Sequence, residues 1–167
     1  MIKKSKILND KAINQKLIRL AWQVFEDNLN EERIIIVGVL GRGEILASRL
    51  SKIISQISSI KPKLGKITLD KDNPFNSEIK VNLDASEYKN EVVILVDDVL
   101  NSGKTLMYAS NFFLTNSLVK LSTVVLVDRN HNRFPIKADY VGLSLATTLQ
   151  EYITVVLNGK DQAVYLS

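Results

Sequence analysis

The stretch VVILVDDVLNSGKT, residues 92–105, determines the fold because a continuous apolar run passes directly into a polar turn. A short apolar run of this kind is typical of a buried parallel strand. Two adjacent carboxylates, Asp97 and Asp98, end the run, and a helical pattern follows over residues 104–116. Another apolar run covers residues 121–127. Strand, helix and strand in this order indicate a βαβ unit.

A second strand and helix of the same kind lie upstream. The β-branched run Ile34–Val37 is followed by helical apolar spacing from Ile45 to Ile57, and residues 64–69 form another strand candidate. An amphipathic helix is expected from Asn9 or Asp10 to about Asn28, and residues 134–167 are rich in short strand patterns. The sequence therefore predicts an α/β fold, with a mainly parallel central sheet flanked by helices and a small β-rich appendage.

Composition restricts the chemistry. The 167 residues, 46% of them hydrophobic and 24% charged, fit one domain over residues 1–167. Without any cysteine, thiolate catalysis and Cys-based metal sites are excluded, and the single histidine, His131, excludes a multi-His cage. No apolar stretch approaches the ~20 residues that span a bilayer. We expect a soluble cytoplasmic protein with no membrane partner, and the net charge of +4 alone is a weak sign of nucleic-acid binding.

The polar turn after residues 92–96 predicts a phosphate site. Ligands of open α/β sheets bind beyond the carboxyl ends of the strands, and free N–H groups at a helix start bind phosphate. A Walker A loop requires glycine where this chain has Asp98, so a nucleoside triphosphatase is disfavoured. Carboxylates next to a phosphate cradle favour a ligand with vicinal hydroxyls beside its phosphate, that is, a ribose 5-phosphate.

Three segments carry a family resemblance. Residues 92–105 resemble the phosphoribosyl pyrophosphate (PRPP) signature of type I phosphoribosyltransferases. The segments IIIVGVLGRGEILASRL (34–50) and VVLVDRNHNRFPIKADYVGLSLATT (124–148) are similar to the bifunctional pyrimidine operon attenuator and uracil phosphoribosyltransferase family. The resemblance extends over nearly the whole chain and is poorest at residues 70–90. It implies the type I phosphoribosyltransferase fold, in which the β-rich appendage is called the hood.

The resemblance also implies a role for each part of the site. The ribose and its 5-phosphate would be bound by Asp97, Asp98, Asn101, Ser102, Gly103, Lys104 and Thr105. The pyrophosphate loop would be Leu40, Gly41, Arg42 and Gly43, and the base would contact Asp128, Arg129, Tyr140, Val141 and Gly142. Asp97, Asp98, Arg42 and Lys71 would be the catalytic residues. Mg²⁺ is the implied cofactor, held by Asp97 and Asp98 and largely through PRPP.

Residues 70–90 would form the lid over the reacting centre. The segment is short, and Asp70 and Lys71 stand where the family has an aromatic residue and an arginine. Lysine lacks the planar fork with which arginine grips pyrophosphate, so we expect PRPP binding with slow turnover.

Three functions remain open. The first is transfer of ribose 5-phosphate to a pyrimidine, with uracil favoured because Asn101 is neutral where purine-using relatives usually have a carboxylate. The second is a pyrimidine-nucleotide-sensing regulator that binds RNA, for which DRNHNRFPIK (128–137) keeps the amount of basic charge but moves its positions. The third is a purine phosphoribosyltransferase. The resemblance implies PRPP with a nucleobase or nucleoside monophosphate as ligands, and a homodimer or larger homo-oligomer.

Overall fold

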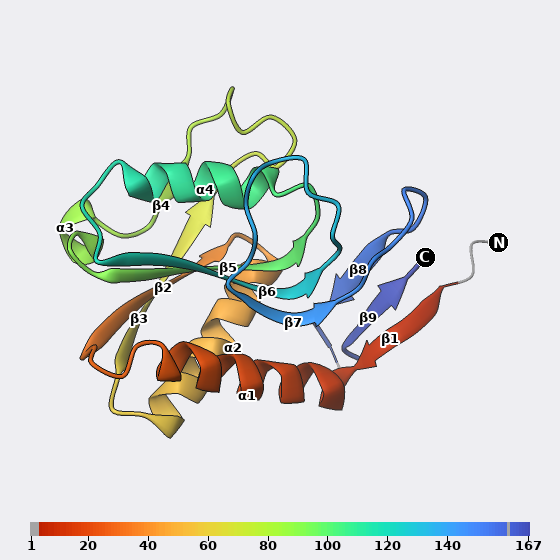
Figure 1. The fold of residues 1–167 in the computed structure, drawn as a ribbon, viewed down its shortest axis with the longest axis horizontal. Helices are drawn as coiled ribbons and strands as arrows, with labels where there is room; N and C mark the ends of the chain where they lie inside the picture. The colour runs from red at the N-terminus through yellow and green to blue at the C-terminus, as the bar shows by residue number, and fades with distance from the viewer. Residues whose placement is uncertain (1–3, 160) are drawn as a thin grey trace.

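A six-stranded sheet forms the centre of the molecule (Figure 1). The computed structural model describes residues 4–159 and 161–167. The strand order is β4-β3-β2-β5-β6-β7, and every neighbouring pair is parallel except β3 and β4. The strands are β2 (Arg33–Val39), β3 (Lys61–Thr68), β4 (Lys80–Val81), β5 (Val92–Leu100), β6 (Lys120–Asp128) and β7 (Tyr140–Ser144). The predicted mainly parallel α/β fold is confirmed.

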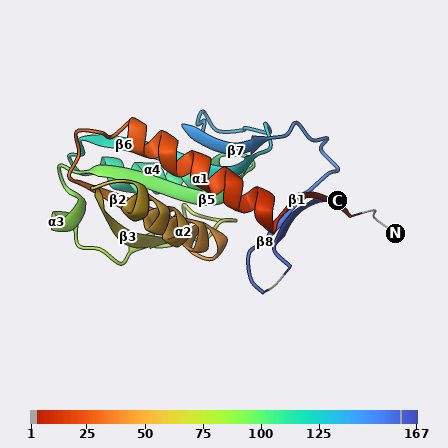
Figure 2. The same ribbon diagram turned by 90° about the horizontal axis from the view of Figure 1, so that it is seen from below.

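Helices cover both faces of this sheet (Figures 1 and 2). One face packs against α1 (Asp10–Glu26) and α2 (Arg42–Ile57), and the other against α4 (Lys104–Leu114) and the short α3 (Ala85–Tyr88). The apolar strand residues alternate between the two cores, as Ile34 and Ile36 do against Ile35 and Val37. A strand buried on both faces needs this continuous apolar sequence, which is why it was visible in the chain. Among the described helices, none is long and apolar enough to cross a membrane.

A small antiparallel sheet makes the hood from both ends of the chain. Its order is β1-β9-β8, with β1 at Ser5–Asn9, β8 at Ile153–Val156 and β9 at Ala163–Leu166. The predicted C-terminal strands are confirmed, whereas β1 was not expected, because its basic, exposed sequence has little apolar alternation. Asn9 ends this strand and also caps α1, accepting a hydrogen bond from the Ala12 N–H at 2.9 Å.

Two glycines seat α2 closely against the sheet. A Cβ on Gly38 would lie 2.4 Å from the Cα of Glu44, and one on Gly43 would lie 2.6 Å from the carbonyl oxygen of Val96. Only residues without side chains permit this approach. As a result, Arg42, the first residue of α2, reaches the acidic end of β5.

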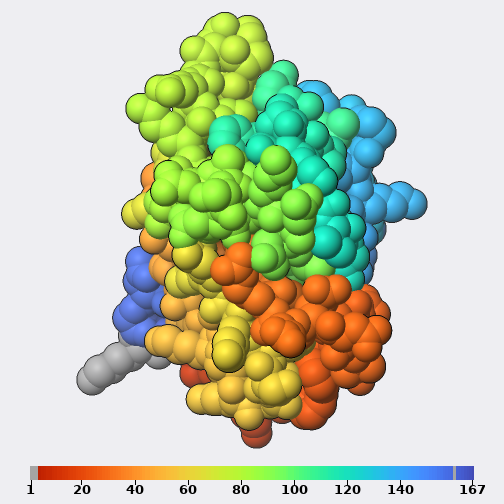
Figure 3. All heavy atoms as spheres, turned by 90° about the vertical axis from the view of Figure 1, so that its left-hand side faces the viewer, coloured from red at the N-terminus to blue at the C-terminus, as the bar shows by residue number. Residues whose placement is uncertain are grey.

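The segment 69–79 joins β3 to β4 and protrudes at the top of the molecule (Figure 3). Residues 78–84 are strand-like in sequence, but their antiparallel pairing with β3 is limited to Lys80 and Val81. Most of the connection is held by its own polar groups instead: the carboxylate of Asp70 accepts from the N–H groups of Asp72 and Asn73. The lid is therefore an ordered loop and not an extended hairpin.

Candidate active site

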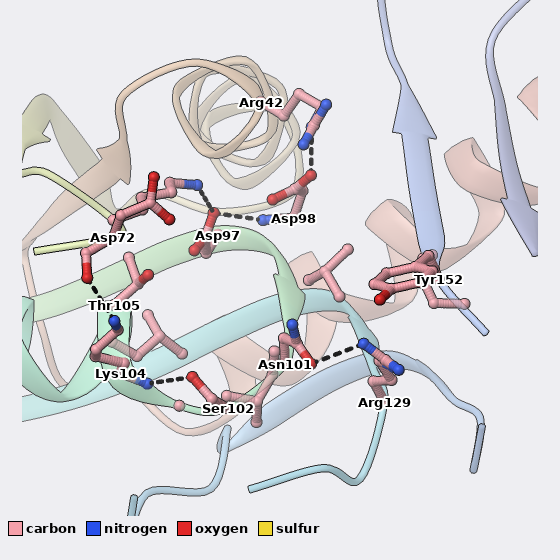
Figure 4. Close-up of a pocket in the computed structure, with 16 residues that line it drawn as sticks. Arg42, Asp72, Asp97, Asp98, Asn101, Ser102, Lys104, Thr105, Arg129 and Tyr152 are labelled. Carbon is pink, nitrogen blue, oxygen red and sulfur yellow. Dashed lines mark hydrogen bonds and ion pairs between the residues drawn. The ribbon is translucent and has the colours of Figure 1, made fainter. Parts of the chain in front are cut away.

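The carboxyl ends of the parallel strands surround a cavity of about 360 Å³ (Figure 4). It is bounded by the start of α2, the 69–79 loop, the end of β5 with the following loop, and the hood. The lining residues are Arg42, Lys71, Asp72, Asp97, Asp98, Val99, Leu100, Asn101, Ser102, Gly103, Lys104, Thr105, Leu106, Arg129, Tyr152 and Ile153. The sequence predicted ten of these as functional residues, and the fold brings those ten together.

Two buried carboxylates form the floor of the cavity. Asp97 and Asp98 are each only 3% exposed. Oδ1 of Asp97 accepts from the Asp98 N–H at 2.9 Å and lies 3.4 Å from the Lys71 ammonium, and Asp98 pairs with the Arg42 guanidinium. Burial and the charge of Asp98 raise the pKa of Asp97 to about 7, although Lys71 opposes the shift. Negative charge on this buried pair is therefore unfavourable. A ligand that brings hydroxyl donors or a metal ion to the two carboxylates would reduce that cost.

The raised pKa predicts how stability varies with pH. Because the folded chain holds a proton on Asp97 that the unfolded chain releases from pH 4 upward, the free energy of unfolding should fall between about pH 4 and pH 7. Asp97→Asn should remove this fall and stabilise the protein at pH 8 by roughly 1–4 kcal/mol, at ~1.4 kcal/mol per pKa unit. Urea unfolding at pH 5 and pH 8 measures both effects. The exposed Asp161→Asn is the control, and an equal fall in both variants would contradict the assignment.

The loop after β5 turns hydrogen-bond donors toward the cavity. Gly103 adopts a left-handed conformation with φ +84° directly before α4. The carbonyl oxygen of Ser102 accepts from the N–H groups of Arg133 at 2.8 Å and Phe134 at 3.1 Å. Because a trans peptide points its C=O and N–H in opposite directions, the Gly103 N–H is turned toward the cavity. The helix N-terminus, this N–H group and the hydroxyls of Ser102 and Thr105 together suit an anion.

The lid loop lies over this cradle in the present structure. The Lys104 ammonium donates to the carbonyl oxygen of Asp72 at 2.6 Å, and Lys71 reaches Asp97 from the same loop. Figure 4 shows Lys104 and Asp72 side by side at the edge of the pocket. Lys71, which the family resemblance places in the lid, therefore lies beside the acidic pair.

Of the four residues 40–43 that the resemblance assigns to pyrophosphate, only one lines the cavity. Arg42 lines the cavity, whereas Leu40, Gly41 and Gly43 are not among its lining residues. Leu40 donates its N–H to the carbonyl oxygen of Ile67 at 2.9 Å, and Gly41 has φ +98° before α2. These residues turn the chain so that Arg42 reaches Asp98.

The hood end of the cavity is organised by Arg129, which is 5% exposed. Its guanidinium donates to Asn101 Oδ1 at 3.0 Å, to Thr147 Oγ1 at 2.7 Å and to the carbonyl oxygens of Thr148 and Glu151 at 3.1 and 2.5 Å. It also lies 5.4 Å from the centre of the Tyr152 ring. Arg129 therefore joins the phosphate loop to the hood.

Tyr152 and Ile153 also line the hood end of the cavity, and neither was predicted from the sequence. Tyr152 is 61% exposed although it is aromatic, and its ring faces the cavity beside Arg129 (Figure 4). The available signal was an aromatic residue at the start of a strand-like stretch, 152–157, within the β-rich C-terminal region. An exposed ring over a cavity is a stacking surface for a planar ligand.

The structure does not bring Tyr140, Val141, Gly142 or Asp128 to the cavity. Tyr140 is 5% exposed in the core beneath α1, where its hydroxyl donates to Asp27 at 2.8 Å. The carbonyl oxygens of Val141 and Gly142 accept from Arg19, and the Asp128 carboxylate accepts from the Asn130 N–H. The predicted base contacts of these four residues must be corrected, because β7 is the edge strand and faces α1 at this point.

Tyr140→Phe tests the correction. Loss of the hydroxyl leaves the Asp27 carboxylate without this donor and should lower the free energy of unfolding by about 0.5–1.5 kcal/mol. Affinity for a nucleoside monophosphate should stay within twofold of the unchanged protein. Chemical denaturation and calorimetry measure the two quantities. A large loss of nucleotide affinity without a loss of stability would restore the residue to the base site.

The comparisons with known proteins agree with this geometry. The phosphoribosyl transferase domain model matches residues 4–156. The Bifunctional protein PyrR of Clostridium acetobutylicum is 39% identical over 169 residues, covering 95% of this chain and 93% of that protein. The protein of the same name from Staphylococcus aureus is 34% identical, covering 93% of each chain.

Solved structures show the same fold at lower sequence identity. The hypoxanthine phosphoribosyltransferase of Trypanosoma cruzi superposes with a TM-score of 0.74 at 18% identity, over 89% of this chain and 84% of that one. That of Staphylococcus aureus gives 0.72 at 22% identity, over 87% and 80%. The chain is therefore a type I phosphoribosyltransferase by fold and belongs to the bifunctional pyrimidine operon attenuator and uracil phosphoribosyltransferase family.

Proposed function

We propose that this protein transfers the 5-phosphoribosyl group of PRPP to a pyrimidine base, with uracil as the first candidate, and releases pyrophosphate. One observation carries the proposal: a single cavity runs from the phosphate loop, across two buried carboxylates with paired cations, to an exposed aromatic ring. Phosphate, hydroxyl, pyrophosphate and base groups follow one another in the same order along PRPP and its acceptor.

Each chemical group of PRPP can be assigned to residues that line the cavity. The 5-phosphate would accept from the N–H groups and hydroxyls of residues 102–105, with Lys104 adding charge once it leaves the carbonyl of Asp72. The ribose 2′- and 3′-hydroxyls would lie on Asp97 and Asp98. Arg42 and Lys71, which now pair with these carboxylates, would turn to the pyrophosphate.

The donor set also fits Mg²⁺. Two neighbouring carboxylates supply the hard oxygen ligands that this ion prefers. No cluster of three or more His, Cys, Asp or Glu side chains occurs among the residues that the structure describes, so most ligands would come from PRPP and water. When bound, Mg²⁺ neutralises charge on PRPP oxygens.

The reaction requires positioning more than covalent chemistry. A bond forms between N1 of uracil and C1′ of the ribose while the bond from C1′ to the pyrophosphate oxygen breaks, and the N1 proton passes to water. Asp97 and Asp98 hold the ribose and offer negative charge beside the oxocarbenium-like centre, while Arg42 and Lys71 stabilise the leaving group. The residues lining the cavity include no activated nucleophile, and none is needed.

The base would stack on Tyr152 with Ile153 beside it. Asn101, which lines the cavity, is neutral, and this favours a pyrimidine over a purine. Pyrimidine and purine rings both stack on tyrosine, so a preference for one of them must come from hydrogen bonds to the polar edge of the base.

A regulatory role is the second candidate, and one contact favours it. The backbone of residues 133 and 134 holds the carbonyl oxygen of Ser102, so the basic loop 129–137 is joined directly to the phosphate cradle. Occupancy of the cradle would be transmitted to a basic loop on the outside of the molecule. In this role the chain senses a pyrimidine nucleotide and binds RNA with weak or no catalysis.

A steady-state assay tests the proposal. PRPP, Mg²⁺ and uracil should yield uridine monophosphate, at a rate below the usual enzyme range of ~1–1000 s⁻¹ because of the lysine in the lid. Hypoxanthine and guanine should react more slowly than uracil. Faster purine transfer would overturn the pyrimidine assignment. PRPP binding without product from any base would support the regulator, for which filter binding should show RNA affinity that decreases with salt.

A further inference from the structure

Asn101 and Arg129 meet at the base end of the cavity in a geometry that defines what the amide can recognise. Nη1 of Arg129 lies 3.0 Å from Oδ1 of Asn101 (Figure 4). A guanidinium carries donors only, whereas an amide has one accepting oxygen and one donating nitrogen. The oxygen must therefore face Arg129, and the assignment of the two amide atoms follows from chemistry.

Arg129 is itself held in one orientation. Its other N–H groups donate to Thr147, Thr148 and Glu151, and its side chain is buried. A side chain with this many fixed partners cannot rotate to accommodate a flipped amide. No hydrogen bond from Nδ2 of Asn101 to another described residue accompanies this arrangement, so the NH₂ group is left for a ligand.

We propose that Arg129 makes Asn101 an obligate hydrogen-bond donor to the base, and that this donor selects bases with a carbonyl oxygen beside the reacting nitrogen. The inference rests on the proposed function and adds the specificity-determining pair to it. Asn101 contacts the base, and Arg129 acts through Asn101 as a positioning residue.

The chemistry of the two base classes explains the selection. In uracil the reacting N1 is bonded to C2, whose oxygen O2 is an acceptor and gains negative charge when N1 loses its proton. An NH₂ donor stabilises that charge. In a 6-oxopurine the reacting N9 has a free lone pair only when the proton is on N7, so the edge near the loop presents N7–H. Two donors would then face each other, and buried unpaired donors are costly.

Asn101→Asp is the decisive variant because it changes an oxygen-and-nitrogen side chain into one with two accepting oxygens. The carboxylate keeps its hydrogen bond from Arg129 and presents an acceptor to the base. We expect kcat/KM for uracil to fall at least about tenfold and the uracil-to-hypoxanthine ratio to shift by about 10–100-fold toward hypoxanthine. Affinity for uridine monophosphate should fall by about tenfold or more, since O2 would meet a carboxylate.

Ribose 5-phosphate separates this proposal from the proposed function. It contains the phosphate and the hydroxyls but no base, so its affinity should be similar in N101D and the unchanged protein. If the unchanged protein bound neither ribose 5-phosphate nor PRPP, the proposed function itself would fall. If both bound normally, and N101D left the uridine monophosphate affinity and the base ratio unaltered, only the specificity pair would be overturned.

Arg129→Lys tests the positioning role. Lysine can donate to Asn101 but loses the planar fork that fixes it on Thr147 and Thr148, so the amide is free to turn. We expect the uracil-to-hypoxanthine ratio to fall severalfold, whereas a merely structural role would lower both activities together. Thermal denaturation identifies a variant that fails to fold, in which case N101D alone decides the matter.

Discussion

Replacing Asp97 and Asp98 together by asparagine should weaken PRPP binding in the presence of Mg²⁺ by at least about 100-fold. Each carboxylate supplies charge-assisted hydrogen bonds, worth about 1.5–3 kcal/mol apiece, and two of them combine to this factor or more. The amides keep the shape of the side chains but neither attract a cation nor accept as strongly from the ribose hydroxyls. Because both residues are buried and the pKa of Asp97 is already raised, the fold should tolerate the change.

The control must change net charge equally at a distance from the cavity. Asp10→Asn combined with Asp161→Asn does so at two exposed positions and should leave PRPP affinity unchanged. Calorimetry measures affinity, and circular dichroism confirms the fold of each variant. Normal PRPP binding by the Asp97 and Asp98 double variant would show that the ligand lies elsewhere.

Gly103→Ala should reduce ribose 5-phosphate binding by at least about tenfold. The residue has φ +84°, which costs alanine roughly 1 kcal/mol or more, and a Cβ would lie 2.7 Å from Cγ2 of Ile136. To relieve these strains the loop must move, and the N–H that points into the cradle moves with it. Since phosphate affinity depends on several N–H groups converging on one anion, a small rotation is enough to lose it.

Gly159→Ala provides a matched control for backbone strain. Gly159 has φ +83°, almost the same as Gly103, but a Cβ there has no atom within 4 Å, and the residue lies between β8 and β9 away from the cavity. Both variants should lose some stability, but only Gly103→Ala should lose affinity for ribose 5-phosphate. Adding Ile136→Ala to Gly103→Ala should recover part of the affinity by removing the clash. Equal affinity for ribose 5-phosphate in the two glycine variants would contradict the assignment of residues 102–105 to phosphate binding.

The part of the cavity formed by the end of β5 and the following loop could be predicted from sequence because its residues are contiguous. A buried strand, two acids, a turn and a helix start follow one another in 92–105, and local rules place them correctly. Lys71 and Arg42 were also predicted, but only through the family resemblance. Their pairing with the acids depends on how α2 and the lid loop pack, which Gly38 and Gly43 permit through close approach and not through a visible pattern.

The base end could not be predicted in the same way because it is assembled from distant segments. Tyr140 was assigned to the base from a motif, yet its strand is at the sheet edge under α1, and its hydroxyl is used by Asp27. The aromatic ring that lines the cavity is instead that of Tyr152, whose position depends on the hood sheet that β1 completes from the other end of the chain. Neither strand sequence indicates that the first strand, β1, pairs with the last strand, β9. The hood sheet could therefore be recognised only from the structure.

Calorimetric titration of the unchanged protein with PRPP, in the presence and absence of Mg²⁺, measures directly whether the cavity beyond β5 binds this ligand. We expect saturable binding at one site per chain, with a dissociation constant in the ~1 μM–1 mM range of enzyme substrates, that weakens strongly when Mg²⁺ is withheld. Competition by ribose 5-phosphate should displace PRPP, because both occupy the cradle of residues 102–105. Absence of saturable PRPP binding, or binding that ribose 5-phosphate does not displace, would contradict this expectation.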